Sequence, residues 1–256
     1  MTQYFDTHAH YDSGKFNADR SDVLRAVHES GVALIVDPGD CAATSARAVA
    51  IAQEYDFVYA AVGWHPEEAA GWTDDSLDQI RALASQPKVC AIGEIGLDYY
   101  WDTSTKATQE TMLRTQLELA LELDLPVIIH DREAHGDSLR IVCDYPGLRG
   151  VFHCFSGSVE MARELLRRGW YLGFDGPITY KNAVKALDVI AACPADRMLL
   201  ETDSPYLAPV PNRGKRNFSG NLPYVVEKLA EIKGVSAEEI IRETTKNARE
   251  MYRITE

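Results

Sequence analysis

The sequence predicts an α/β protein folded as a (β/α)8 TIM barrel, and three observations lead to this fold class. The chain has 256 residues, a length typical of closed α/β barrels. Short apolar runs rich in Val, Ile and Leu alternate with amphipathic stretches along the chain. No Gly-rich dinucleotide signature or phosphate-binding loop follows an early apolar run, as an open doubly wound sheet would usually show. We therefore expect one barrel domain over residues 1–256.

Each predicted strand is nearly continuous in apolar residues, as expected when a parallel sheet is buried on both faces. In chain order the predicted strands are Tyr4–His10, Ala33–Gly39, Phe57–Gly63, Val89–Gly96, Pro126–Asp131, Gly150–Phe155, Tyr171–Gly176 and Met198–Ser204. The stretches between them have the helical spacing of apolar residues. The predicted helices are Asp19–Ser30, Ala42–Tyr55, Asp74–Ser85, Ala107–Leu123, Ala134–Tyr145, Val159–Arg168, Asn182–Ala192, Asn221–Lys233 and Ala237–Tyr252.

The composition excludes disorder and fibrous architectures, because 46% of the residues are hydrophobic and 25% are charged. The formal net charge of −13 repels polyanions and membranes at long range, so any contact with nucleic acid must be local. No segment approaches the roughly 18 apolar residues that span a bilayer. Five widely spaced cysteines, an odd number, argue against a disulfide framework and favour a reducing cytoplasm. The oligomeric state stays open, with a monomer as one option.

Residues that can bind metal ions gather at one predicted end of the barrel. Barrel enzymes build their sites at the carboxyl ends of the strands. Six metal-capable side chains fall there on five predicted strands: His8, His10, Glu94, His130, His153 and Asp203. Each of them alone could be a hydrogen-bonded buried or surface residue, but five such coincidences on one rim favour a metal site.

These ligand types and their number predict two divalent ions. Imidazole and carboxylate ligands without thiolate suit Zn²⁺, Mn²⁺, Mg²⁺ or Fe, and six ligands exceed what one tetrahedral ion needs. Glu94 can bridge two ions, and ions about 3.5–4 Å apart can stabilise both oxygens of a phosphoryl displacement. Asp203 can bind a metal and also accept the proton of the attacking water. Glu94 and Asp203 are therefore the predicted catalytic residues. For Glu201, a buried hydrogen bond to a ligand histidine and a direct role both stay open.

Seven motifs along the chain carry a resemblance to a known family: Phe5-Asp6-Thr7-His8-Ala9-His10, Gly63-Trp64-His65-Pro66, Gly93-Glu94-Ile95-Gly96-Leu97-Asp98-Tyr99, Pro126-Val127-Ile128-Ile129-His130, His153-Cys154-Phe155-Ser156-Gly157, Glu201-Thr202-Asp203-Ser204-Pro205 and Arg213-Gly214-Lys215-Arg216-Asn217. With them the chain resembles the TatD-type metal-dependent deoxyribonucleases, within the amidohydrolase-like barrels of the metal-dependent hydrolase type, over nearly its whole length. The segment Phe218-Ser219-Gly220 departs from the acidic residue and proline that many members carry there.

The resemblance implies how the six ligands divide between two ions. One ion would be bound by His8, His10, Glu94 and Asp203, and the other by Glu94, His130 and His153. It also implies hydrolysis of DNA phosphodiester bonds, from the 3′ end or on single strands. Related members have been linked to the removal of D-amino acids from tRNA.

Candidate substrate contacts surround this predicted centre. His65, on the rim of the third strand, could donate to a substrate phosphate, hold an additional metal ion or cap its loop. Arg132 follows His130 by two residues and could face the phosphate or form a surface ion pair. Arg213, Lys215 and Arg216 place three cations in a loop after the eighth strand, where barrels often bind phosphate. This basic loop is the best candidate for contact with a nucleic-acid backbone.

Two other functions are compatible with the same residues. An amidohydrolase-like enzyme could act on a small ester, an amide or a D-aminoacyl-tRNA, because an activated water attacks several electrophiles. A metal-binding scaffold protein is the alternative that is not an enzyme. The predicted fourth strand has Glu94 and no lysine in its carboxyl half, which favours the nuclease-like branch over barrels bridged by a carboxylated lysine. Together with the basic loop, this carboxylate on the fourth strand favours the nuclease over the two other functions.

Overall fold

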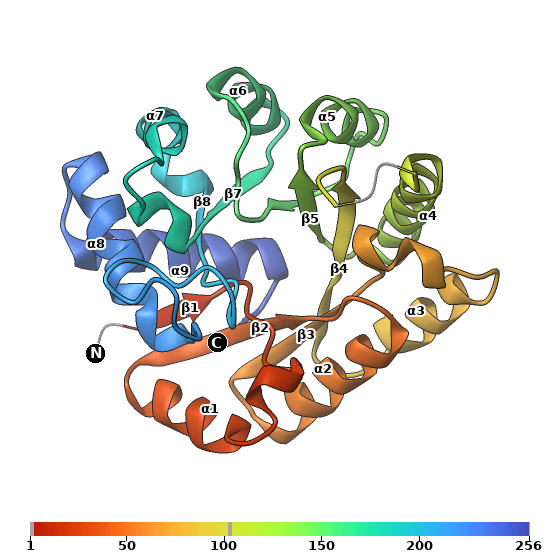
Figure 1. Ribbon diagram of the computed structural model, residues 1–256, viewed down its shortest axis with the longest axis horizontal. Coiled ribbons are helices and arrows are strands. Elements are labelled where there is room, and N and C mark those ends of the chain that lie inside the picture. Colours follow the sequence, from red (N-terminus) through yellow and green to blue (C-terminus); the bar gives the residue numbers. More distant parts are fainter. Residues whose placement is uncertain (1–2, 102–103, 256) are drawn as a thin grey trace.

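The computed structural model describes residues 3–101 and 104–255, and within them strands and helices alternate as a (β/α)8 barrel (Figure 1). The strands pair in parallel and in chain order; they are β1 (Tyr4–Asp6), β2 (Val32–Pro38), β3 (Val58–Val62), β4 (Val89–Asp98), β5 (Val127–Arg132), β6 (Gly150–Phe152), β7 (Tyr171–Phe174) and β8 (Met198–Leu200). The helices are α1 (Arg20–Glu29), α2 (Ala42–Glu54), α3 (Ser76–Ala84), α4 (Lys106–Leu123), α5 (His135–Cys143), α6 (Val159–Arg167), α7 (Val184–Ala192), α8 (Leu222–Lys233) and α9 (Ala237–Tyr252). The predicted fold class is confirmed.

The single domain expected over residues 1–256 stays a prediction. Its ends, residues 1–2 and 256, and the internal pair 102–103 lie outside the described residues. None of the helices in the described part is long and apolar enough to cross a bilayer. All five cysteines carry free thiols.

The barrel closes between β1 and β8 through the segments that follow these strands. The backbone N–H of Asp203 donates to the carbonyl of His8 at 2.9 Å, and the N–H of His10 donates to the carbonyl of Ser204 at 2.6 Å. Ala9 and Ser204 pair as an isolated parallel bridge. The first and last strands therefore place their candidate metal ligands side by side.

Six strands end earlier than the sequence predicts, and three of them, β1, β6 and β8, end at least three residues earlier. These three stop at Asp6, Phe152 and Leu200, where the predicted ends were His10, Phe155 and Ser204. Two residues just beyond these ends, Cys154 (φ 41°) and Asp203 (φ 55°), have left-handed backbone conformations, which a strand does not contain. Several candidate metal ligands therefore lie on the loops that follow these strands and not on the strands themselves.

Strand side chains alternate between two hydrophobic clusters. On β5, Ile128 points into the barrel, whereas Val127 and Ile129 pack outward against the helices. The inner cluster contains residues such as Phe5 and Leu34, near the amino ends of the strands. The sheet is thus buried on both faces, as its continuous apolar runs predict.

Helix α9 closes the amino end of the barrel. Its residues Ala248, Met251 and Tyr252 belong to the inner cluster. The ring of Tyr252 stacks on Phe5, with centroids 6.0 Å apart, and its hydroxyl donates to the carbonyl of Thr7 at 3.0 Å. In Figure 1, α9 lies inside the ring formed by the other helices, behind β1. The open end is therefore the one at the carboxyl ends of the strands.

Candidate active site

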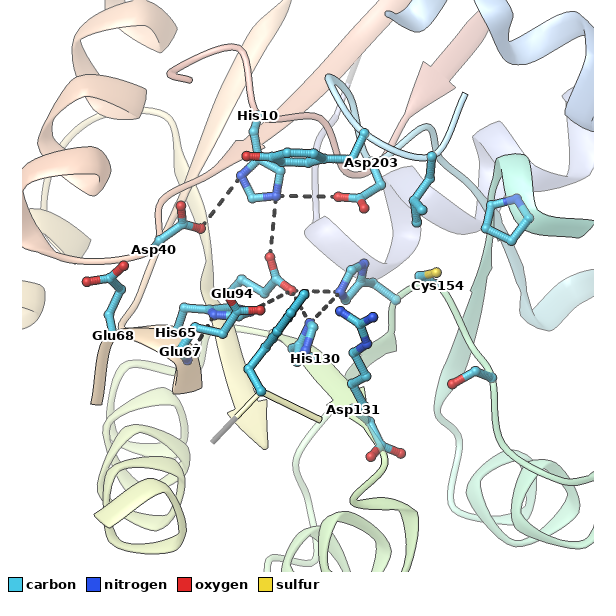
Figure 2. Close-up of a pocket in the computed structure, with 17 residues that line it drawn as sticks. His10, Asp40, His65, Glu67, Glu68, Glu94, His130, Asp131, Cys154 and Asp203 are labelled. Carbon is cyan, nitrogen blue, oxygen red and sulfur yellow. Dashed lines mark hydrogen bonds and ion pairs between the residues drawn. The ribbon is translucent and has the colours of Figure 1, made fainter. Parts of the chain in front are cut away.

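A cavity of about 580 Å³ opens at the carboxyl ends of the strands (Figure 2). Its walls come from β4, β5 and the segments that follow β1, β2, β3, β4, β6, β7 and β8. Five of the six predicted metal ligands line it: His10, Glu94, His130, His153 and Asp203. The sixth, His8, has no exposed side-chain surface and lies behind them. The structure therefore brings all six predicted ligands together.

Glu94 directs one carboxylate oxygen toward each of two pairs of histidines. Its Oε2 lies 3.2 Å from Nε2 of His8 and 3.4 Å from Nε2 of His10. Its Oε1 lies 2.7 Å from Nε2 of His153 and 2.8 Å from Nδ1 of His130. The Glu94 side chain is only 4% exposed. A carboxylate placed in this way can offer one oxygen to each of two cation sites.

Asp203 completes the first group of donors. Its Oδ1 lies 3.5 Å from Nε2 of His10 and 3.7 Å from Nε2 of His8, and these two imidazole nitrogens are 3.1 Å apart. On the other side of His10, Oδ1 of Asp40 lies 3.7 Å from Nδ1 (Figure 2). The sequence analysis missed Asp40, although its position just beyond the predicted end of the second strand was a signal for it.

The second group of donors contains His130 and His153, whose facing nitrogens are 3.3 Å apart. His65 approaches the same region, with Nε2 3.4 Å from Oε1 of Glu94. Nδ1 of His65 also accepts the backbone N–H of Glu67 at 3.2 Å, at the start of a 3-10 helix. His65 thus caps its loop and faces the donor cluster at the same time.

Residues behind the donor cluster orient the histidines. Oδ2 of Asp98 lies 3.0 Å from Nε2 of His130, and Oδ1 of Asp98 accepts the backbone N–H of Tyr100 at 2.8 Å. From the sequence, Asp98 was not among the candidate site residues, and its contact with His130 was not predicted. Glu201 is fully buried, accepts the N–H of Cys154, and lies 3.8 Å from Nδ1 of His153. A hydrogen-bonded outer partner, as Asp98 is for His130, fixes the ring orientation of a ligand histidine, whereas Glu201 lies too far from His153 for a hydrogen bond.

Charges inside the cluster keep the two central carboxylates ionised. Burial alone would raise the pKa of Glu94, but the facing imidazoles of His153 and His8 hold it well below its usual range. Burial likewise opposes ionisation of Asp203, yet a hydrogen bond from His10 lowers its pKa. Burial, together with the neighbouring His153, lowers the pKa of His8 to about 4, so its imidazole is neutral at pH 7.

Burial opposes protonation of His10 and His130, yet Asp40 holds the pKa of His10 well above its usual range, and hydrogen bonds with Asp98 and Glu94 raise the pKa of His130 to about 10. Without bound cations these two imidazoles are therefore protonated, and they would release protons on binding a cation.

The donor set fits divalent metal ions. Five groups of three described side chains each place their ligand atoms within 4.8 Å of one another: His8–His10–Asp203, His8–Glu94–His153, His65–Glu94–His130, His10–Asp40–Glu94 and Glu67–Asp98–His130. Nδ1 of His8 and Nδ1 of His153 are buried and have no hydrogen-bond partner within the described part of the chain. Nitrogen and carboxylate donors without thiolate suit Zn²⁺, Mn²⁺ or Fe, and carboxylates suit Mg²⁺.

The predicted substrate contacts separate into two sets. Arg132 lines the cavity, and its guanidinium lies 4.0 Å from the ring centroid of Tyr100. The three cations of the basic loop do not line the cavity. Arg213 lies over the ring of Tyr180 at 4.4 Å, and Lys215 is exposed. The third, Arg216, forms an ion pair of 2.6 Å with Asp19.

A barrel with these donors at the carboxyl ends of its strands defines a metal-dependent hydrolase. The family model of the TatD-related DNases matches residues 5–253, and the chain belongs to this family. It is 44% identical over 252 residues to YabD of Bacillus subtilis, named an uncharacterized metal-dependent hydrolase, covering 98% of this chain and 99% of that protein.

Two further relatives extend this comparison. The chain is 36% identical over 258 residues to the 3′-5′ ssDNA/RNA exonuclease TatD of Cronobacter sakazakii, with 97% of each chain covered. The crystal structure of YjjV, a TatD homologue from Escherichia coli, superposes with a TM-score of 0.93 at 34% identity and covers 99% of both chains. Fold, donor set and family thus agree on a metal-dependent hydrolase.

Proposed function

We propose that this protein hydrolyses phosphodiester bonds of single-stranded DNA and proceeds from the 3′ end. The observation that carries the proposal is the position of Glu94, with one oxygen toward each pair of histidines. Two divalent ions in such an arrangement suit phosphoryl displacement. The Cronobacter relative named a 3′-5′ ssDNA/RNA exonuclease supports both the substrate class and the polarity.

We assign the residues of the centre to two ions that share Glu94. His8, His10 and Asp203 would complete one site, and His130 and His153 the other. When bound, the ions would lower the pKa of a water molecule and offset the charge of the phosphodiester. Their identity is left to measurement among Zn²⁺, Mg²⁺, Mn²⁺ and Fe.

The remaining roles follow from where each side chain lies. Asp203 is 14% exposed at the cavity and ionised, so its carboxylate can accept a proton from the attacking water. His65 and Arg132 also line the cavity and can donate hydrogen bonds to the phosphate. Arg213 and Lys215, outside the cavity, would bind the backbone further along the strand.

One experiment tests substrate, polarity and metal together. The metal-free protein is reconstituted with one divalent metal at a time, and bound ions are counted per chain. Each form is then given single-stranded DNA labelled at the 5′ or the 3′ end. We expect two ions per chain and release of the 3′ label as mononucleotide. Ion binding equal to that of a His8→Ala/His10→Ala variant would contradict the site, and release of internal fragments would contradict the polarity.

A second candidate is hydrolysis of a small ester or amide, or of a D-aminoacyl-tRNA. Acidic residues around the opening, Glu67, Glu68 and Asp131, favour it, because they would repel a polyanion. The cavity also has the size of small-molecule sites. Turnover of such esters without turnover of DNA would favour this candidate. A metal scaffold would bind ions and hydrolyse neither substrate.

The cytoplasmic location expected from the five cysteines stays a prediction.

A further inference from the structure

Exposed apolar side chains gather beside the cavity. Of the large hydrophobic side chains that are exposed among the described residues, only two lie away from the loops after β4 and β8, namely Leu121 and Val184. The other six are Tyr100, Trp101, Tyr206, Leu207, Val210 and Phe218. Concentrated exposure of this kind marks a contact surface, whereas scattered exposure needs no explanation.

The loop after β4 carries the most exposed aromatic pair. Trp101 is 65% exposed and Tyr100 is 55% exposed. Their rings meet edge to face, with centroids 4.7 Å apart at 89°. The guanidinium of Arg132 lies 4.0 Å from the ring centroid of Tyr100 and 5.3 Å from that of Trp101. Trp101 thus has Tyr100 and Arg132 as neighbours, and its large exposure leaves ring surface open to solvent.

This aromatic pair is continuous with the candidate active site. Trp101 and Arg132 both line the cavity that also contains Glu94 and His130. Asp98, which contacts His130, also accepts the backbone N–H groups of Tyr100 and Trp101, at 2.8 and 3.3 Å. One carboxylate thus links the loop that carries the aromatic pair to the donor cluster.

The charge around the opening favours an uncharged mode of substrate binding. Among the described residues that line the cavity, Arg132 is the one lysine or arginine, whereas Glu67, Glu68, Asp40 and Asp131 are acidic. Attraction of phosphates by side chains is therefore weak at the opening itself. Stacking of a base on an aromatic ring needs no charge, and each base has a face that can stack.

We propose that Trp101, supported by Tyr100 and Arg132, is a stacking platform for an unpaired base next to the bond that is cleaved. The inference rests on the proposed nuclease function and adds how the enzyme selects its substrate. In a duplex, both faces of a base are covered by its neighbours, so only a single strand or a frayed end can place a base on the indole.

The test compares two single-stranded DNAs of about 12 nucleotides that share one backbone. One carries all its bases, and the other lacks the bases of its last three 3′ nucleotides. The metal-reconstituted wild type, Trp101→Ala, Trp101→Phe and Leu121→Ala proteins are compared. Leu121 is the control, because it is an exposed apolar residue on α4 that does not line the cavity.

We expect the wild type and Leu121→Ala to bind the complete strand about tenfold better than the strand without terminal bases. Trp101→Ala should bind the complete strand about tenfold more weakly and no longer distinguish the two, with kcat little changed. Trp101→Phe should restore part of the preference. DNA should quench the tryptophan fluorescence of the wild type and of Leu121→Ala, but hardly that of Trp101→Phe, because Trp64 and Trp170 are buried and the partly buried Trp72 packs on the core and does not line the cavity.

Different failures have different meanings. If the wild type hydrolyses DNA but Trp101→Ala keeps the full preference for terminal bases, the platform is wrong and the nuclease function stands. If Trp101→Ala binds both strands more weakly by the same factor, Trp101 contacts the backbone and the platform is again wrong. If the wild type neither binds nor hydrolyses either strand, the proposed function fails and the platform fails with it.

Discussion

The two ends of the barrel are built from opposite kinds of residue. At the carboxyl ends of the strands, imidazoles and carboxylates converge in and behind the cavity. At the amino ends, α9 covers an inner cluster that is almost entirely apolar. Apolar burial stabilises a fold, whereas groups gathered to bind cations do so only when cations are present. The closed end therefore provides stability on which the open end depends.

Buried acidic residues near the open end lower the stability of that end, and the rest of the fold must compensate for this cost. Burial raises the pKa of Glu201 well above its usual range, and the neighbouring Asp175 raises it further. Burial also raises the pKa of Asp6 to about 6, although hydrogen bonds from Ser219 and Thr202 oppose the shift. Keeping such groups out of water requires free energy from elsewhere in the fold.

The largest expected effect is a loss of hydrolysis at the open end without a matching loss of stability. Glu94→Gln keeps the shape of the side chain but removes the charge that both histidine pairs face. Loss of an outer partner of a metal ligand typically reduces metal affinity or activity about 10- to 100-fold, so loss of a shared ligand should reduce hydrolysis by more than about 100-fold. Metal content and turnover of single-stranded DNA measure this effect.

The control for Glu94→Gln is its thermal unfolding with and without metal. Bound metal should raise the unfolding temperature of the wild type, because a ligand that binds only the folded state stabilises it. The metal-free variant should unfold near the metal-free wild type. Near-normal hydrolysis by a well-folded variant would exclude Glu94 as the shared ligand.

The next effect concerns stability at the closed end. Met251 of α9 is 1% exposed within the inner cluster, and Met251→Ala should lower the free energy of unfolding by about 2–5 kcal/mol. Urea unfolding measures this change. Hydrolysis per folded molecule should stay at the wild-type level. Leu121→Ala is the matched control and should change stability by less than about 0.5 kcal/mol. If Met251→Ala also lowered kcat of the folded enzyme, the two ends would not be independent.

A smaller effect is expected on DNA binding by two exposed cations of the basic loop at the open end. Among the described residues, neither Arg213 nor Lys215 forms an ion pair with an acid, whereas Arg216 binds Asp19. Arg213→Ala/Lys215→Ala should therefore weaken DNA binding several-fold and reduce its salt slope by about 0.7 per lost phosphate contact. Turnover of a small phosphodiester and stability should be unchanged. Equal loss on both substrates would mean that the loop shapes the cavity instead.

The strand and helix order and the convergence of the six candidate ligands at the open end could be predicted from the sequence. Periodicity and position at strand ends are local signals, and His8, Glu94 and His130 each stand where such a signal places them. The contact between Asp98 and His130 was not predicted, because β4 continues two residues beyond its predicted end at Gly96 and so places Asp98 beside β5. The left-handed conformation of Asp203, which shortens the last predicted strand, has no sequence signal of its own, since it is a non-Gly residue.

The closed end was less predictable than the open end. The helix Ala237–Tyr252 was predicted with its observed bounds, because its apolar residues have helical spacing. Spacing indicates that one face is buried but not what covers it. That Tyr252 stacks on Phe5 inside the barrel therefore required the structure.

The smallest expected effect lies at the polar edge of the closed end. Asp124, just after α4, bonds Arg253, which follows α9, at 2.5 Å and Arg149 at 2.8 Å. Hydrogen bonds from Arg253 and Arg149 lower the pKa of Asp124 from 3.8 to about 2. Because the folded-state pKa is below the unfolded one, the stabilisation is present above about pH 4 and is lost as the pH falls toward 2.

Asp124→Asn isolates this charge. Asp124 has a left-handed backbone conformation (φ 53°) that asparagine also tolerates, so the backbone should stay in place. The variant should be slightly less stable than the wild type at pH 7 and low salt, because exposed ion pairs contribute little. The difference should shrink at high salt and as the pH falls from about 4 through 2, because the carboxyl of Asp124 then becomes protonated and neutral like the asparagine. Urea unfolding at several pH values measures it. A difference as large as that of Met251→Ala would show that ion pairs rather than apolar packing hold α9 against the barrel, and the contrast between the two ends would then need revision.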